Sequence, residues 1–363
     1  MPFFVGPGSS PDGGLEMKSD RVGMNTSTLT ALSGVGTANG DAYLHTVGSG
    51  TTFMLYGPTG WFPMADGQTF PDPPSGITAT GGTKETGVSN PDGNTYTYHY
   101  FTSSGPFDVT AVSGPGVIEY LIVASGGAGG FSQNGDNRRG GGGGGAGGVI
   151  TNFNGNPYAP SGPNVTVSVQ DYPLGVGGGG PAPGPGSVGQ APDSTAFGLT
   201  AKGGGGGGQN EGQNASDGGS GGGAGATGNV NSTAGSSSPS SQGNPGGSGP
   251  SNHGGGGGGA GSSGNTTQAG EGLRFFGTHA IPSSYGSTGP EPGRYFAGGG
   301  GGGDRSSGGS PGKAGGGRGG GENAEGDDGT ANTGSGGGGA GGGPQNINGG
   351  DGASGIIIVR YLE

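Results

Sequence analysis

The sequence predicts a mainly β protein with little or no α-helix, in which a small N-terminal β module precedes a β-sandwich that anchors a bundle of polyglycine-II rods. The first observation behind this prediction is the amino-acid composition. Glycine accounts for 107 and proline for 27 of the 363 residues, whereas hydrophobic residues make up only 26%. The apolar residues are also concentrated in a few strand-like segments. A small β core with a large glycine body therefore fits the chain better than one conventional core.

The glycine runs predict packed rods. Glycine costs about 0.5–1 kcal/mol per residue in a helix or strand relative to alanine. A polyproline-II-type rod has no internal hydrogen bonds, so its N–H and C=O groups point sideways and need neighbouring rods as partners. A rod enclosed on all sides needs glycine throughout, so pure runs should be interior and mixed runs peripheral. The run 140–148 recurs in varied form at 203–208, 218–225, 254–261, 298–303, 315–321 and 336–343, of which 218–225 and 315–319 are clearly mixed.

Residues 1–75 have the most ordinary composition and predict an N-terminal β module. Segments 40–47 and 51–56, a Pro/Gly turn and then 61–64 indicate three short strands, with Phe53, Tyr56 and Trp61 forming a small core. Residues 76–92 are rich in turn-forming residues and are predicted to be a linker.

The glycine-rich domain is predicted to span 93–363. In 95–101, Tyr96, Tyr98 and Tyr100 share one face of a strand, and in 107–112 Phe107, Val109 and Ala111 point inward. The apolar runs 117–124 and 355–361 are typical of buried neighbouring strands that bracket the glycine region. The predicted β core comprises 93–124, 164–169, 194–201 and 355–361.

These segments carry a resemblance. A strand Glu-Tyr-Leu-Ile-Val-Ala (119–124) leads into glycine, Val-Thr-Val-Ser-Val (165–169) and Phe-Gly-Leu-Thr-Ala (197–201) follow, and the chain ends on Gly-Ala-Ser-Gly-Ile-Ile-Ile-Val-Arg-Tyr. This order resembles the glycine-rich domain of phage tail-fibre and adhesin proteins. The resemblance implies a virion protein made in the host cytoplasm and released by lysis. It implies a homotrimer that attaches to other tail or fibre proteins of the virion through the module 1–75. It also implies binding to a host-surface receptor, either a polysaccharide or an outer-membrane protein.

If the rods run alternately out from the β core and back, the loops at the free end, away from that core, should bind the receptor. The expected loops are 131–139, about 181–187, 209–217, 250–253, 304–313 and 344–348, which are polar and rich in amides. The candidate receptor-binding residues are Phe131, Asn134, Asp136, Asn137, Arg138, Arg139, Gln209, Asn210, Glu211, Asn214, Asp217, His253, Asp304, Arg305, Lys313, Gln345 and Asn346.

An aromatic segment, 273–296, interrupts the glycine region. The direction count places it at the end next to the β core, where it would cover an exposed sheet face. At the free end it would instead be the leading receptor contact.

Other functions find little support in the residues. The net charge of −12 argues against nucleic acid as a partner, and no apolar run is long enough for membrane insertion. The absence of cysteine excludes thiolate chemistry. The sequence does not begin with a basic region followed by an apolar stretch, so we expect no signal peptide. The histidines lack metal-ligand spacing, and His45 and His99 are expected on sheet surfaces. We expect no enzyme, no metal and no cofactor.

Three alternatives stay open at this stage. The protein could be a purely structural virion fibre or decoration protein, an ice-binding protein, or a disordered cell-wall glycine-rich protein.

Overall fold

The computed structural model describes residues 76–133, 139–153, 162–210, 213–226, 232–250, 252–266, 268–275, 280–305 and 312–363, and the strand backbone within 42–64. The chain divides into two units, Met1–Pro73 and Pro74–Glu363. The described part is all-sheet, as the composition predicts, and contains no α-helix.

In the first unit, three antiparallel strands confirm the predicted strand order. They are β1 (Ala42–Val47), β2 (Gly50–Gly57) and β3 (Gly60–Met64), in the sheet order β1-β2-β3. Tyr56 lies opposite Trp61 in the register. The predicted small core of aromatic side chains, and His45, lie outside the described side chains.

The second unit begins with two facing sheets. The larger sheet has the order β10-β8-β16-β6-β5, and β9 also pairs with β8; the smaller has the order β11-β7-β4. The strands are β4 (Ile77–Thr80), β5 (Thr83–Ser89), β6 (Thr95–Phe101), β7 (Gly105–Val112), β8 (Val117–Val123), β9 (Val149–Thr151), β10 (Val165–Thr166), β11 (Gln170–Leu174) and β16 (Ile356–Leu362). The predicted linker 76–92 is therefore wrong for most of its length, because β4 and β5 are members of the two sheets.

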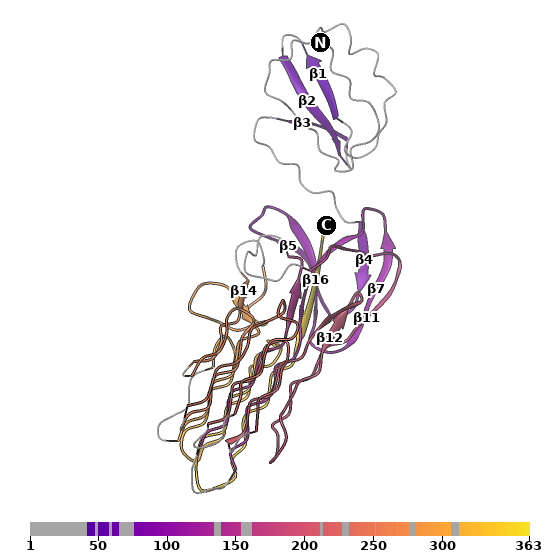
Figure 1. Ribbon diagram of the computed structural model, residues 1–363. Coiled ribbons are helices and arrows are strands. Elements are labelled where there is room, and N and C mark those ends of the chain that lie inside the picture. The colour runs from indigo at the N-terminus through magenta and orange to yellow at the C-terminus, as the bar shows by residue number, and fades with distance from the viewer. Residues whose placement is uncertain are drawn as a thin grey trace. The chain divides into compact units, whose positions relative to one another are not determined.

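The C-terminal strand β16 is the centre of the larger sheet. It pairs antiparallel with β8 through Ile358↔Leu121 and with β6 through Ile358↔Tyr100. This confirms that the two apolar runs bracketing the glycine region are neighbours. Figure 1 shows β16 in yellow among the indigo and magenta strands of the early chain.

Apolar side chains from both sheets form the sandwich core. Phe107 and Val109 of β7 pack in the same buried cluster as Ile122 of β8 and Ile357 of β16. Ala111, predicted to point inward, is exposed instead. A β-bulge between Thr78 and Ala79 shifts the register with β7, and an extra residue of this kind turns the following side chains to the other face.

His99 is wholly buried, contrary to the sequence prediction of a surface position. Its ring nitrogens lie 2.7 Å from the Gly81 carbonyl oxygen and 3.2 Å from the Tyr361 hydroxyl. Burial lowers the pKa of His99 to about 4, so the ring is neutral at pH 7. The histidine is buried because both faces of β6 are covered.

The aromatic segment 273–296 covers the outer face of the larger sheet. Its hairpin, β14 (Leu273–Phe275) and β15 (Arg294–Phe296), shares a buried cluster with the β6 tyrosines. The ring of Tyr285 stacks on Tyr100 with centroids 4.3 Å apart. The structure thus supports the first of the two placements that the sequence allows, with the segment at the sheet end of the bundle.

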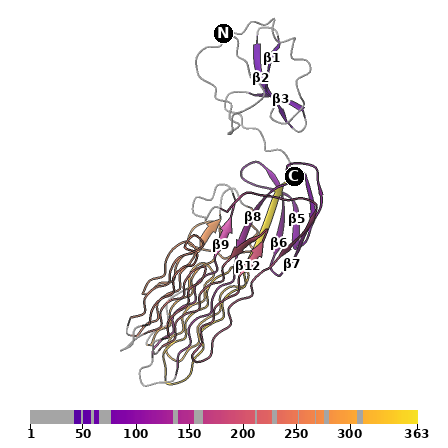
Figure 2. The same ribbon diagram turned by 45° about the vertical axis from the view of Figure 1, so that its right-hand side comes forward.

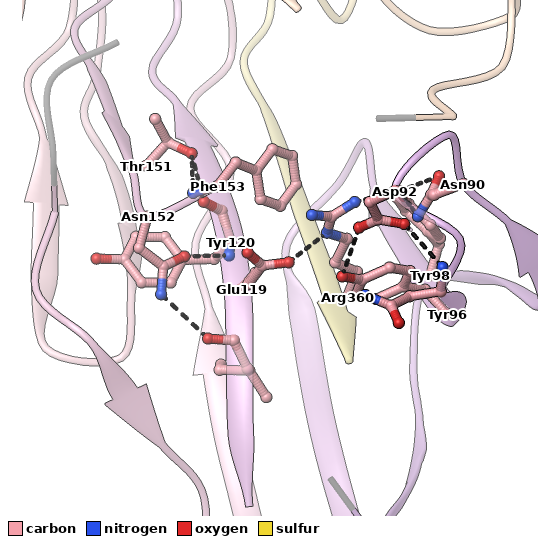
Figure 3. Close-up of polar contacts among 12 residues, drawn as sticks. Asn90, Asp92, Tyr96, Tyr98, Glu119, Tyr120, Thr151, Asn152, Phe153 and Arg360 are labelled. Carbon is pink, nitrogen blue, oxygen red and sulfur yellow. Dashed lines mark hydrogen bonds and ion pairs between the residues drawn. The ribbon is translucent and has the colours of Figure 1, made fainter. Parts of the chain in front are cut away.

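A buried ion pair crosses the larger sheet. Figure 3 shows Arg360 of β16 between Glu119 of β8 and Tyr98 of β6. Arg360 Nε donates to Glu119 Oε2 at 2.6 Å and its Nη1 donates to the Tyr98 hydroxyl at 2.9 Å. The guanidinium also lies 4.1 Å from the ring centroid of Tyr96 and 4.8 Å from that of Phe153. The charge, 1% exposed, is therefore paired and enclosed by aromatic faces.

Strands continue directly into the glycine rods, which lie side by side and extend away from the sheets (Figures 1 and 2). The rod 124–132 follows β8, and the rod 347–355 leads into β16. Segment 194–201 was predicted as one strand but forms the hairpin β12 (Ser194–Ala196) and β13 (Leu199–Ala201). Positive φ angles at Phe197 (53°) and Gly198 (76°) make its tight turn.

The rod 140–148 has rods on all sides. Its N–H groups bond in turn to three neighbours, and every third residue returns to the same one, as three residues per turn require. Its C=O groups accept from three further segments, 300–303, 220–226 and 124–130. The predicted interior position is confirmed. The donated bonds are Gly141–Ala340, Gly144–Gly337 and Gly147–Gly334 to one rod, Gly142–Gly208, Gly145–Gly205 and Gly148–Lys202 to a second, and Gly143–Gly255 and Ala146–Gly258 to a third.

Two mixed runs have opposite outcomes. In 315–321, Arg318 is exposed and the rod is peripheral, as predicted. In 218–225, Ser220 is 0% exposed and donates its N–H to Ala146 of the interior rod, so the predicted peripheral position is wrong. Interior rods tolerate occasional small side chains, since Ala224 and Ala340 are also 0% exposed.

Peripheral rods also form where the sequence has no pure glycine run. Segment 324–330 returns along the bundle, with Gly329 donating to Asp351 and Thr330 to Gly315. In and just before this rod, Glu322, Glu325 and Asp328 are exposed at three-residue spacing, which is the period of one rod face.

Candidate functional site

Chain reversals from distant parts of the sequence meet at the free end of the bundle. Ser132 and Ile347 exchange backbone hydrogen bonds of 2.9 Å, which joins the predicted loops 131–139 and 344–348. His253 and Asp304 form another bridge, which joins the loops 250–253 and 304–313. The alternating direction of the rods therefore brings these loops together as the sequence analysis expected.

The pair His253–Asp304 fixes one part of this end. His253 Nδ1 lies 3.0 Å from Asp304 Oδ1, with the histidine half-exposed and the carboxylate nearly buried. The backbone of Asp304 donates to Gly320 and accepts from Gly342. This residue therefore holds together three rods where they end.

Several candidate receptor-binding residues are buried. Asp304 is 5% exposed and Phe131 is 3% exposed. Side chains this enclosed support the loops and do not offer a surface to a large partner, in contrast to the sequence prediction. The other buried candidates are Arg139, Gln209 and Asn210.

Other candidates lie at the free end and are exposed. They are His253, Arg305, Gln345 and Asn346. Asn134, Asp136, Asn137, Arg138 and Glu211 lie outside the described residues.

Lys313 lies elsewhere. Its N–H donates to Gly299, next to the start of the rod that leaves β15, and its Nζ pairs with Glu271 at 3.3 Å. Lys313 is therefore at the sheet end, and the predicted loop 304–313 ends too late. Residues 312–315 turn at the sheet end and are not part of a free-end loop.

Asn214 and Asp217 lie on a returning rod. Asp217 Oδ1 accepts from the N–H of Ser236, and Gly219 donates to Gly203, near the start of a rod that leaves the sheets. The predicted loop 209–217 is thus mostly rod, and Asp217 approaches the sheet end. Both side chains are exposed on the flank of the bundle.

Within the described residues, one turn at the free end was not predicted from the sequence. Residues 321–324 reverse there, with Asn323 in the left-handed region (φ 58°) and its N–H donated to Gly342. Glu322 and Asn323 are exposed. The end of the glycine run 315–321 could have predicted this turn, since the chain reverses there into the peripheral rod 324–330.

The exposed groups at this end are amides, carboxylates, a guanidinium and an imidazole, which suit hydrogen bonding to a polar surface. Within the described residues, no cluster of three or more His, Asp or Glu side chains is arranged to hold a metal ion. Among the same residues, no helix has the length and apolar character to cross a bilayer.

Comparison with known proteins identifies the larger unit. The family model of the glycine-rich domain matches residues 102–362. No curated protein matches the sequence. The matched region covers β7 to β16 and every rod, from the sheets to the free end. The chain belongs to the glycine-rich domain family.

Proposed function

We propose that the protein is a phage tail-fibre adhesin, a non-enzymatic virion protein that binds a host-surface receptor through the loops at the free end of its glycine bundle. One observation carries the proposal. Polar turns from segments more than a hundred residues apart are held together at one end of a scaffold whose other end is anchored in a sandwich. Binding residues are often found on loops that a rigid scaffold positions.

The scaffold supports this role physically. The interior rod 140–148 donates a backbone hydrogen bond to a neighbouring rod at every residue from Gly141 to Gly148, and strands continue into the rods without a break. The bases of the free-end loops are therefore held in place by the rods, and preorganisation of this kind improves affinity. The resemblance to phage fibres leads us to propose a homotrimer attached to other tail proteins through residues 1–75.

The test is adsorption of particles that carry the protein. We expect the double variant Gln345→Ala with Asn346→Ala to slow adsorption, because both side chains are exposed at the free end. Thr233→Ala and Ser236→Ala, exposed on the flank of the bundle, are the matched control and should adsorb normally.

Exchange of the loop 131–139 for that of a related fibre should change host range. Normal adsorption by both the double variant and the loop exchange would assign the protein a purely structural role in the virion.

A further inference from the structure

Two consecutive amide side chains end the rod that leaves β13. Gln209 is 2% exposed and Asn210 is 5% exposed. In a rod with three residues per turn, adjacent side chains point about 120° apart, so the two amides reach different neighbours. Both were candidates for direct receptor contact in the sequence.

Gln209 binds the backbone of the loop 183–187. Its Oε1 accepts from the N–H of Gly186 at 2.9 Å, and its Nε2 donates to the carbonyl of Gly184 at 2.9 Å and to that of Ser187. Both amide atoms are thus engaged with one turn. No hydrogen of this amide remains for a ligand.

Asn210 binds the base of the loop 131–139 in the same manner. Its Oδ1 accepts from the N–H of Gln133 at 2.8 Å, and its Nδ2 donates to the Gln133 carbonyl at 3.0 Å and the Ser132 hydroxyl at 3.4 Å. Ser132 Oγ in turn donates to the carbonyl of Arg139 at 2.8 Å, which closes the base of the loop.

We propose that Gln209 and Asn210 are positioning residues that clamp the base of the loop 131–139 and the loop 183–187 to one rod, and so set the position of that base relative to the loop 183–187. Where the rods end, backbone N–H and C=O groups lose their rod partners and need others. Each amide supplies two N–H donors and an acceptor oxygen, whereas a hydroxyl has only one donor and an ionised carboxylate has none. Only the binding role of the clamped loops rests on the proposed function.

Exchange of individual backbone amides tests the clamp. In Asn210→Ala we expect exchange at Gln133 to accelerate about tenfold, since the bond to Oδ1 is lost. In Gln209→Ala the same should occur at Gly186. Asn210→Asp keeps the acceptor for the Gln133 N–H but loses the donor to the Gln133 carbonyl, so exchange there should accelerate less than in Asn210→Ala. Gln213→Ala, an exposed glutamine three residues along, is the matched control and should change neither amide.

Two results would overturn the clamp. One is unchanged exchange at Gln133 and Gly186 in the alanine variants. The other is acceleration that is equal in interior rods such as 140–148, which would mean general loss of stability.

Adsorption of particles that carry Asn210→Ala separates this inference from the proposed function. With the clamp lost, we expect adsorption roughly threefold to tenfold slower than for Gln213→Ala. Faster exchange at Gln133 together with normal adsorption would keep the clamp and refute the receptor-binding role of these loops.

Discussion

An added methyl group at Gly143 should destabilise the bundle strongly. Gly143 lies in the interior rod 140–148, and a Cβ built on it would lie 2.0 Å from the carbonyl oxygen of Gly300 and 2.5 Å from its carbon. Ordinary contacts are longer by more than about 1 Å, so the rods must separate there. Gly300 cannot move freely, because its N–H donates to Gly144 and its C=O accepts from Gly257.

The magnitude follows from these contacts. Overpacking in a close-packed interior costs about 1–3 kcal/mol. Separation of the rods also weakens the two hydrogen bonds of Gly300, each with a net contribution of about 1 kcal/mol. Gly143→Ala should therefore lower the free energy of unfolding by about 3–5 kcal/mol. A domain with ordinary stability of about 5–15 kcal/mol would lose much of it.

Gly178→Ala is the matched control. Gly178 lies on a peripheral rod, its φ is not in the left-handed region, and nothing lies within 4 Å of a Cβ built there. Alanine at such a site changes stability little or adds about 0.4–1 kcal/mol by restricting the unfolded chain. Guanidinium unfolding followed by near-ultraviolet circular dichroism of the buried tyrosines measures both. Equal stability of the two variants would refute close packing of the rods.

The sheets supply three further predictions. The pKa of His99 is 6.5 in the unfolded chain and about 4 when folded, so the free energy of unfolding should be fully present above pH 6.5 and fall by about 3 kcal/mol towards pH 4. His99→Gln should flatten that fall in denaturant titrations, and an unchanged slope would contradict it. Glu119→Gln should cost about 3–5 kcal/mol by leaving Arg360 buried without its partner, whereas the double variant with Arg360→Met should cost less in a double-mutant cycle. Deletion of 356–363 should abolish the cooperative transition in calorimetry, because β16 is the central strand of the larger sheet; a retained transition would contradict the topology.

The sequence predicted those parts of the fold in which a run of residues can pack in only one way. The buried apolar runs of β8 and β16 could only be neighbours inside a sheet, and the long glycine run 140–148 could be packed only with other backbones. The alternation of residues along a strand does not predict burial where a segment distant in the sequence covers the strand. Nothing in the alternation of β6 shows that both of its faces are covered. The hairpin β14–β15 covers the tyrosine face, and β7 of the smaller sheet covers the face that carries His99, so His99 was wrongly predicted to be exposed.

Local sequence also hid the points at which the chain reverses. Segment 218–225 reads as one mixed run, but the chain turns at its start and Ser220 lies in the interior. A Cβ on Gly243 would lie 2.2 Å from Ser220 Oγ, so valine at Ser220 should destabilise the bundle, whereas a peripheral position, as predicted for mixed runs, would tolerate it. Peripheral rods such as 324–330 need glycine only where they face inward, and their sequence resembles a loop.

The candidate site was predictable in position and less so in chemistry. Alternation of rod direction correctly placed the loops 131–139 and 344–348 at one end. The role of each amide could not be read from sequence, since a buried Asn210 and an exposed Gln345 are similar residues in similar loops. The two amides differ because Asn210 lies next to backbone groups that have lost their partners at the end of a rod. Which backbone groups these are depends on the packing of the rods and cannot be read from the sequence.

The central functional claim is tested most directly by measuring how fast virus particles adsorb to the host. Particles that carry Gln345→Ala with Asn346→Ala are compared with particles that carry the flank control Thr233→Ala with Ser236→Ala. If the free end binds the receptor, the first pair should adsorb more slowly while the second matches the wild type. Equal adsorption by both, with both proteins folded and incorporated, would contradict it.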